Sequence, residues 1–153
     1  MNLPSQHTPV KRRAPRKRAD KQPMCIASKC RRARYDGAKL CAKHEADRLF
    51  SLYIRDRDGE CVGHTFVPEV ACKGELQCMH LVSRGYLAVR WDPQNALAGC
   101  AAHHMFLTEH PVHHEQFCRE AIGTKTWEAL RQAALTGERQ HPADVIAEFG
   151  GAA

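Results

Sequence analysis

The chain has 153 residues, with 23 basic and 17 acidic side chains and a formal net charge of +6. This length allows one modest domain with accessory segments and excludes two large cores. No run of about 18 apolar residues is present, and the N-terminus lacks the apolar stretch of a secretory signal, so we expect no membrane association. A cytoplasmic protein is therefore expected, in which paired thiols more often bind metal than form disulfides.

The first 21 residues carry the whole net charge. They contain seven basic residues and one acidic residue, so the remaining 16 basic and 16 acidic residues balance. The segment also contains three prolines and shows no apolar periodicity, which is typical of a disordered arm. Such a run binds phosphates by releasing their counterions, so it favours nucleic acid as the partner over a merely solubilising role.

A first zinc module is predicted directly after the arm. Its expected ligands are Cys25, Cys30, Cys41 and His44, in the pattern C-x4-C-x10-C-x2-H. Two chelating pairs separated by a loop suit tetrahedral zinc with thiolate and imidazole ligands. An amphipathic helix is predicted over residues 42–56, because its apolar side chains recur on one face, and Asp58-Gly59 is expected to end it.

A second zinc site is predicted further along the chain. Its expected ligands are Cys61, Cys72, Cys100 and His103. His64 competes with Cys72 for one position, because Cys61-x2-His64 has the tighter knuckle spacing. We favour Cys72, since the lysine and glycine that follow it can turn the chain directly into the next strand. Either choice predicts one structural zinc here, and therefore two in the chain.

The segment between these ligands is predicted to form two strands followed by a helix. The expected elements are strands over residues 76–82 and 88–91, a loop over 92–95 and a helix that begins after Cys100. This order places His80 on the first strand, Asn95 in the connection and His104 on the helix. Hydrolysis of a phosphodiester needs a general base, a divalent cation and a group that orients the base, and these three side chains can supply them.

Each of these residues has an expected role. His80 is the candidate base, because a neutral imidazole is available near pH 7, and His104 can offer a nitrogen to the cation. Asn95 can either orient the His80 ring or bind the cation through its amide oxygen. Arg84 and Arg90 are candidates for binding the non-bridging phosphate oxygens.

At these residues the chain resembles the HNH family of nucleases. The resemblance covers residues 57–123 and rests on LQCMHLVSRG at 76–85, RWDPQN at 90–95 and CAAHH at 100–104. The chain is most similar to bacteriophage-type members, including the NinG-like recombination endonucleases. The resemblance implies an α+β fold with a zinc-stabilised ββα-metal core. It also implies DNA cleavage with Mg²⁺, Mn²⁺ or another divalent cation in a bacterial host cell, through His80, Asn95 and His104.

Met79 departs from the family pattern. Many members have an acidic residue or a histidine there as a metal ligand, and a thioether is a poor ligand for a hard divalent cation. His110 is a candidate extra ligand, but a surface histidine beside a helix start is at least as good an interpretation. His113 and His114 receive no role. Cys78 and Cys118 fall outside both zinc sites, and we expect them to pack as small buried side chains.

The sequence divides into five expected parts. They are a basic arm over residues 1–23, a zinc module over 24–45, a linking helix over 46–57, the nuclease core over 58–123 and a helical extension over 124–153. The extension should contain helices over 126–135 and 142–149, and a helix over 111–122 should precede it. The alternative to a nuclease is a non-catalytic zinc-stabilised nucleic-acid-binding protein. Cleavage of both strands of a duplex would indicate a homodimer or a second protein, because HNH units often nick one strand.

Overall fold

The computed structural model describes residues 24–35 and 39–152. In chain order the main elements are α1 (Ala42–Asp58), α2 (Gly63–Phe66), β1 (Leu76–His80), β2 (Ala96–Cys100), α3 (Ala101–Glu109), α4 (Pro111–Ile122), α5 (Thr124–Thr136) and α6 (Pro142–Phe149). Short 3-10 turns cover Pro93–Asn95 and Gly150–Ala152. The α+β class is confirmed. The predicted basic arm, residues 1–23, lies outside the described residues.

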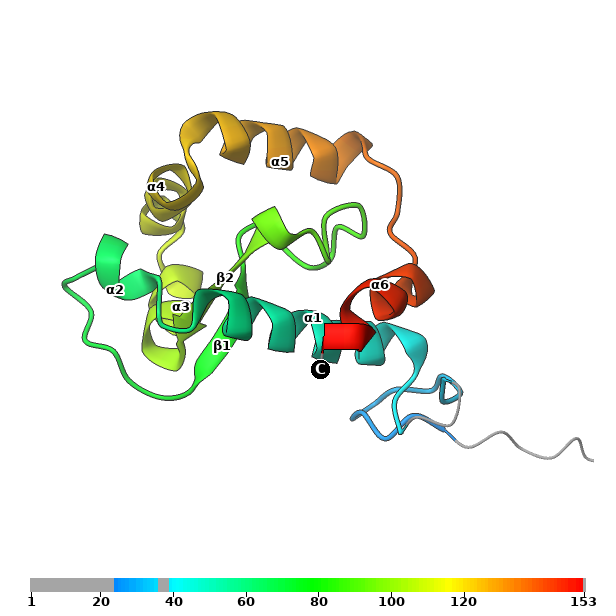
Figure 1. Ribbon diagram of the computed structural model, residues 1–153. Coiled ribbons are helices and arrows are strands. Elements are labelled where there is room, and N and C mark those ends of the chain that lie inside the picture. Colours follow the sequence, from blue (N-terminus) through cyan, green and yellow to red (C-terminus); the bar gives the residue numbers. More distant parts are fainter. Residues whose placement is uncertain (1–23, 36–38, 153) are drawn as a thin grey trace, which may run out of the picture.

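The two strands form an antiparallel hairpin that leads directly into α3. Leu76 lies opposite Cys100 and His80 lies opposite Ala96. The long connection between the strands lies between α1 and α5 (Figure 1). Because α3 begins at the residue after β2, and Cys100 lies opposite Leu76, the start of α3 lies beside the start of β1.

The prediction of a second strand over residues 88–91 is wrong, because this segment forms turns and the second strand is Ala96–Cys100. Arg90 and Trp91 both donate hydrogen bonds to the Asp47 carboxylate. Adjacent residues of a strand point to opposite faces, so two neighbours that bind one carboxylate cannot continue a regular strand. The first strand is also shorter than predicted and ends at His80.

Two apolar clusters cover opposite faces of the hairpin. One contains Met79 together with side chains of α3, α4 and α5, among them Phe117 and Trp127. The other joins α1, β2 and α6, and the neighbouring strand residue Cys78 packs against it. Successive side chains of a strand alternate between faces, so Met79 and Cys78 are expected to enter different clusters. Figure 1 shows α6 beside α1 and α5 on the far side of the inter-strand connection.

Helix α1 connects two regions that are rich in cysteine. Its buried side chains are Ala46, Leu49, Phe50 and Ile54, which recur at the spacing of one helical face. Gly59 ends the helix with a φ of 70°, a conformation that glycine adopts without strain. A helix of 17 residues is about 25 Å long, so α1 holds its two ends at a fixed separation. Among the described residues, no helix combines the length and the apolar character needed to cross a membrane.

Candidate functional site

The first candidate metal centre lies at the start of α1. It consists of Cys25, Cys30, Cys41 and His44, whose ligand atoms all lie within 4.8 Å of one another. The His44 Nδ1 atom is 3.4 Å from the Sγ atoms of both Cys25 and Cys41, and Cys30 Sγ is 3.8 Å from Cys41 Sγ. Nitrogen and sulfur ligands of one tetrahedral zinc lie about 3.5 to 3.8 Å apart. The cluster therefore has the donor set and the dimensions to hold a zinc ion.

The second candidate centre lies beyond the other end of α1. It consists of Cys61, Cys72, Cys100 and His103, again with all ligand atoms within 4.8 Å. The His103 Nδ1 atom is 3.4, 3.8 and 3.1 Å from the Sγ atoms of Cys61, Cys72 and Cys100 respectively. This cluster can hold a zinc ion in the same way. His64, the competing ligand, is exposed on α2 and lies outside the cluster.

The orientation of His103 is fixed by its surroundings. The ring is completely buried, and its Nε2 atom donates to the carbonyl oxygen of Val67 at 3.1 Å. This contact places the ring proton on Nε2 and leaves the Nδ1 lone pair toward the three sulfur atoms. Gly63 makes the arrangement possible, since a Cβ atom there would lie 2.6 Å from the His103 ring. Backbone and glycine thus prepare the ring as a ligand.

Thiol ionisation also favours a cation at these clusters. Burial opposes ionisation of Cys100, but hydrogen bonds involving His103 and the backbone outweigh it and lower the pKa to about 6. For Cys72, desolvation followed by the nearby Cys61 and Cys100 sulfurs raises the pKa to about 11. Several thiolates this close repel one another, and a bound dication relieves that repulsion.

His80 lies at the end of β1 with one ring nitrogen committed. Its Nε2 atom donates to the carbonyl oxygen of Arg90 at 2.9 Å, so the lone pair is on Nδ1. Burial lowers the pKa of His80, the Arg90 carbonyl opposes this, and the positive charges of Arg90 and Arg84 lower it further. The ring is therefore neutral near pH 7, as a proton acceptor must be.

His80 and His104 line the same surface hollow. The hollow has a volume of about 260 Å³ and lies between the end of β1 and the helices α3 and α4. The Nδ1 atom of His104 lies 2.8 Å from Gln77 Oε1, so the Nε2 lone pair is available when the glutamine oxygen accepts. Burial and the charge of Arg84 lower the pKa of His104.

A third histidine, His114, lines this hollow, and no role is expected for it from the sequence. His114 is half-buried on α4, and its pKa is lowered first by burial and also by the charge of His104. No short spacing motif links His114 to His80, so only the turn from α3 into α4 brings them together. Its neighbour His113 is exposed, and the candidate extra ligand His110 stacks on Phe106 with ring centroids 4.3 Å apart.

Asn95 supports the inter-strand connection rather than facing His80. Its Oδ1 atom accepts from the backbone nitrogen of Val82 at 2.6 Å, and its Nδ2 atom donates to the carbonyls of Val82 and Val89 at 3.0 and 2.8 Å. The side chain is fully buried. Its amide is therefore occupied by backbone groups, and neither expected role, orienting the His80 ring or binding a cation, has a contact that supports it.

The two arginines differ sharply in their surroundings. Arg90 is buried, donates twice to Asp47 at 2.8 and 2.7 Å, and donates to the Arg84 carbonyl. Its guanidinium is thus occupied within the fold and is not presented to a phosphate. Arg84 is exposed on the turn after β1, and its side chain forms no ion pair with another described residue.

The remaining cysteines pack as apolar side chains. Cys118 is completely buried in the apolar cluster that contains Met79 and Phe117. Cys78 is half-buried against the apolar cluster that joins α1, β2 and α6. Burial raises the pKa of each to about 12, so neither is a thiolate near pH 7.

Comparisons with protein-family models, curated proteins and solved structures gave no match. The function must therefore be inferred from the residues themselves.

Proposed function

We propose that the protein is a metal-dependent endonuclease that hydrolyses DNA phosphodiester bonds. The observation that carries the proposal is the hollow shared by His80 and His104, in which the Arg90 carbonyl leaves a lone pair on the Nδ1 atom of a neutral His80. A simple zinc module does not require such a pair of imidazoles beyond its own ligands. The resemblance to HNH nucleases at His80, Asn95 and His104 supports the same assignment.

In the proposed reaction, His80 acts as the general base. Its Nδ1 atom accepts a proton from a water molecule while the water oxygen forms a bond to phosphorus. The ester bond to the sugar oxygen breaks, and that oxygen leaves with the electron pair and takes a proton from solvent. Arg84 binds a non-bridging phosphate oxygen, because its side chain is exposed and it directly follows Ser83, which lines the hollow.

A divalent cation bound by His104 and His114 would supply charge stabilisation for the phosphorane and the leaving oxygen. His114 lines the same hollow as His104. Its imidazole would replace the metal ligand that many HNH nucleases have at the position of Met79. Met79 is buried in the apolar cluster and packs against Gly99, so it contributes no ligand. Zinc at the two Cys3His clusters has a structural role in this proposal, because each cluster already offers four ligands.

Incubation of supercoiled plasmid with the zinc-loaded protein tests the activity. Conversion to the open circle is expected with Mg²⁺, Mn²⁺ or Ni²⁺ and should stop when EDTA is added. A protein that binds the plasmid but leaves it supercoiled with every ion would be a non-catalytic zinc-stabilised nucleic-acid-binding protein. The two clusters and the exposed Arg84 would serve that second function equally well.

A further inference from the structure

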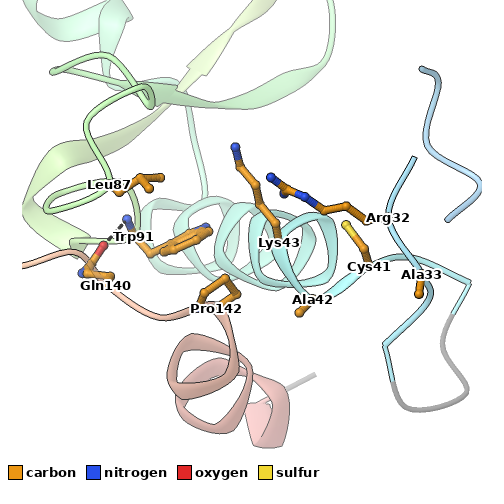
Figure 2. Close-up of a pocket in the computed structure, with 9 residues that line it drawn as sticks. All are labelled: Arg32, Ala33, Cys41, Ala42, Lys43, Leu87, Trp91, Gln140 and Pro142. Atoms are coloured by element: carbon orange, nitrogen blue, oxygen red, sulfur yellow. Dashed lines mark hydrogen bonds between the residues drawn. The ribbon is translucent and has the colours of Figure 1, made fainter. Parts of the chain in front are cut away.

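A second hollow lies beside the first turn of α1. It has a volume of about 400 Å³, and Arg32 of the first zinc module and Lys43 of α1 line it together with Leu87, Trp91 and Pro142. Figure 2 shows the Lys43 ammonium group and the Arg32 guanidinium group reaching toward the same space above α1. The first zinc module and the start of α1 thus bring two cations to one concave surface, and distant segments at Leu87, Trp91 and Pro142 complete its lining.

The two cations have no carboxylate partner among the described residues. Asp47 lies four residues after Lys43 on α1, but its oxygens already accept hydrogen bonds from Arg90 and Trp91. Like charges this close repel one another, and an anion bound between them would remove the repulsion.

Arg84 connects this hollow to the one lined by His80 and His104. It lies in the turn between Ser83, which lines the histidine hollow, and Leu87, which lines the second hollow. Its side chain is exposed, so a bound molecule can contact it. A positively charged path therefore runs from the histidine hollow across Arg84 to Lys43 and Arg32.

The lining of the second hollow indicates which anion it suits. Among the described residues that line it, the one aromatic ring belongs to Trp91, which is 2% exposed and so cannot stack on a base. The amide of Gln140 accepts from the Trp91 backbone nitrogen at 2.7 Å, so its oxygen is occupied within the fold. The charged side chains of the hollow are a lysine and an arginine, which commonly contact the sugar-phosphate backbone.

We propose that Lys43 and Arg32 bind a backbone phosphate of the nucleic-acid strand, apart from the phosphate held at His80 and His104, with Arg84 between the two. The inference rests on the proposed function, because it takes the strand at the histidine hollow as its starting point. It also gives the first zinc cluster a purpose: the cluster holds Arg32 against α1. The contact is independent of base sequence and depends on salt.

Binding measurements on the full zinc-loaded chain test this site. In a His80→Ala background that prevents cutting, the affinity for a fluorescent DNA duplex is measured over a series of KCl concentrations. Lys43→Ala combined with Arg32→Ala should weaken binding by about tenfold at low salt and reduce the slope of log K against log salt by about one, the effect of losing one phosphate contact. Lys125→Ala is the matched control, since Lys125 is exposed on α5 and should leave affinity and slope unchanged.

The outcomes separate this site from the proposed activity. A double variant that retains two zinc ions and an unchanged slope would overturn the phosphate site, whatever the nicking assay shows. Competition by polyglutamate that equals competition by DNA at the same charge concentration would also overturn it, because the hollow would then bind carboxylates as well as phosphates. If the double variant has the reduced salt slope but the wild type does not nick plasmid, the phosphate site is supported and only the nuclease proposal is refuted.

Discussion

The Nε2 atom of His80 donates a hydrogen bond to the carbonyl oxygen of Arg90 at 2.9 Å. Arg90 is held in turn by Asp47 on α1, so the long helix indirectly sets the tautomer of a histidine at the end of β1. The same relationship brings the charge of Arg90 close enough to lower the pKa of His80. Fold and proposed chemistry therefore depend on the same contact.

The pH dependence of nicking follows from this environment. Burial, followed by the charges of Arg90 and Arg84, lowers the pKa of His80 although the Arg90 carbonyl opposes the shift. A base works only when neutral, so a lowered pKa extends activity toward acid pH. We expect kcat/KM to stay level down to about pH 6.5, the ordinary histidine value, and to fall only below it. An acid limb centred above that value would contradict the assignment.

Removing the partner of Arg90 should strongly destabilise the fold. In Asp47→Ala the buried guanidinium loses its bidentate partner, and we expect the free energy of unfolding to fall by about 3 kcal/mol. Arg48→Ala is the control, because its pair with Glu45 is exposed and should contribute less than about 1 kcal/mol. Urea unfolding of the zinc-loaded proteins gives both values. An equal fall in the free energy of unfolding of the two variants would show that the buried pair stabilises the fold no more than the exposed one.

Asn95 should act through stability. Asn95→Ala leaves two carbonyls and one backbone N–H of the inter-strand connection without their partner, which should cost about 3 kcal/mol in the free energy of unfolding. Gln94→Ala is a matched neighbour, because that side chain is exposed and should change stability by less than about 0.5 kcal/mol. An Asn95→Ala protein that unfolds like the wild type yet fails to nick DNA would instead place Asn95 in the chemistry.

Zinc content distinguishes the two candidate ligands of the second cluster. The wild type and His64→Ala should each contain two zinc ions per chain, because His64 lies outside both clusters. Cys72→Ser should contain one, since it removes a thiolate from the second cluster. Elemental analysis of dialysed protein measures these ratios. The opposite pattern, with zinc lost only from His64→Ala, would show that the cluster geometry is wrong.

The sequence predicted those parts of the fold in which the interacting residues are close together in the chain. The C-x2-H pairs at His44 and His103 and the apolar face of α1 could be read from the sequence, because their partners are three or four residues apart. The second strand was misplaced, since the buried ion pair of Arg90 with Asp47 joins residues 43 positions apart. No local sequence pattern predicts a contact between residues so far apart in the chain.

The candidate site could be predicted only in part, because some of its residues meet through contacts between distant segments. The predicted order of elements and the needs of phosphodiester hydrolysis, together with the resemblance, pointed to His80 and His104, and the structure brings both to one hollow. His114 and the hollow at Lys43 and Arg32 were missed, because they arise from packing between separate elements. Arg90 looked like a phosphate ligand in the sequence, but burial with Asp47 removes it from the surface.

The most direct test of the account is the rate of plasmid nicking by His80→Ala. The variant should retain two zinc ions and wild-type DNA affinity, because His80 belongs to neither Cys3His cluster. Its nicking rate should fall at least about a hundredfold, the usual contribution of a general base. A folded, zinc-loaded His80→Ala protein that nicks plasmid at the wild-type rate would contradict the proposed mechanism.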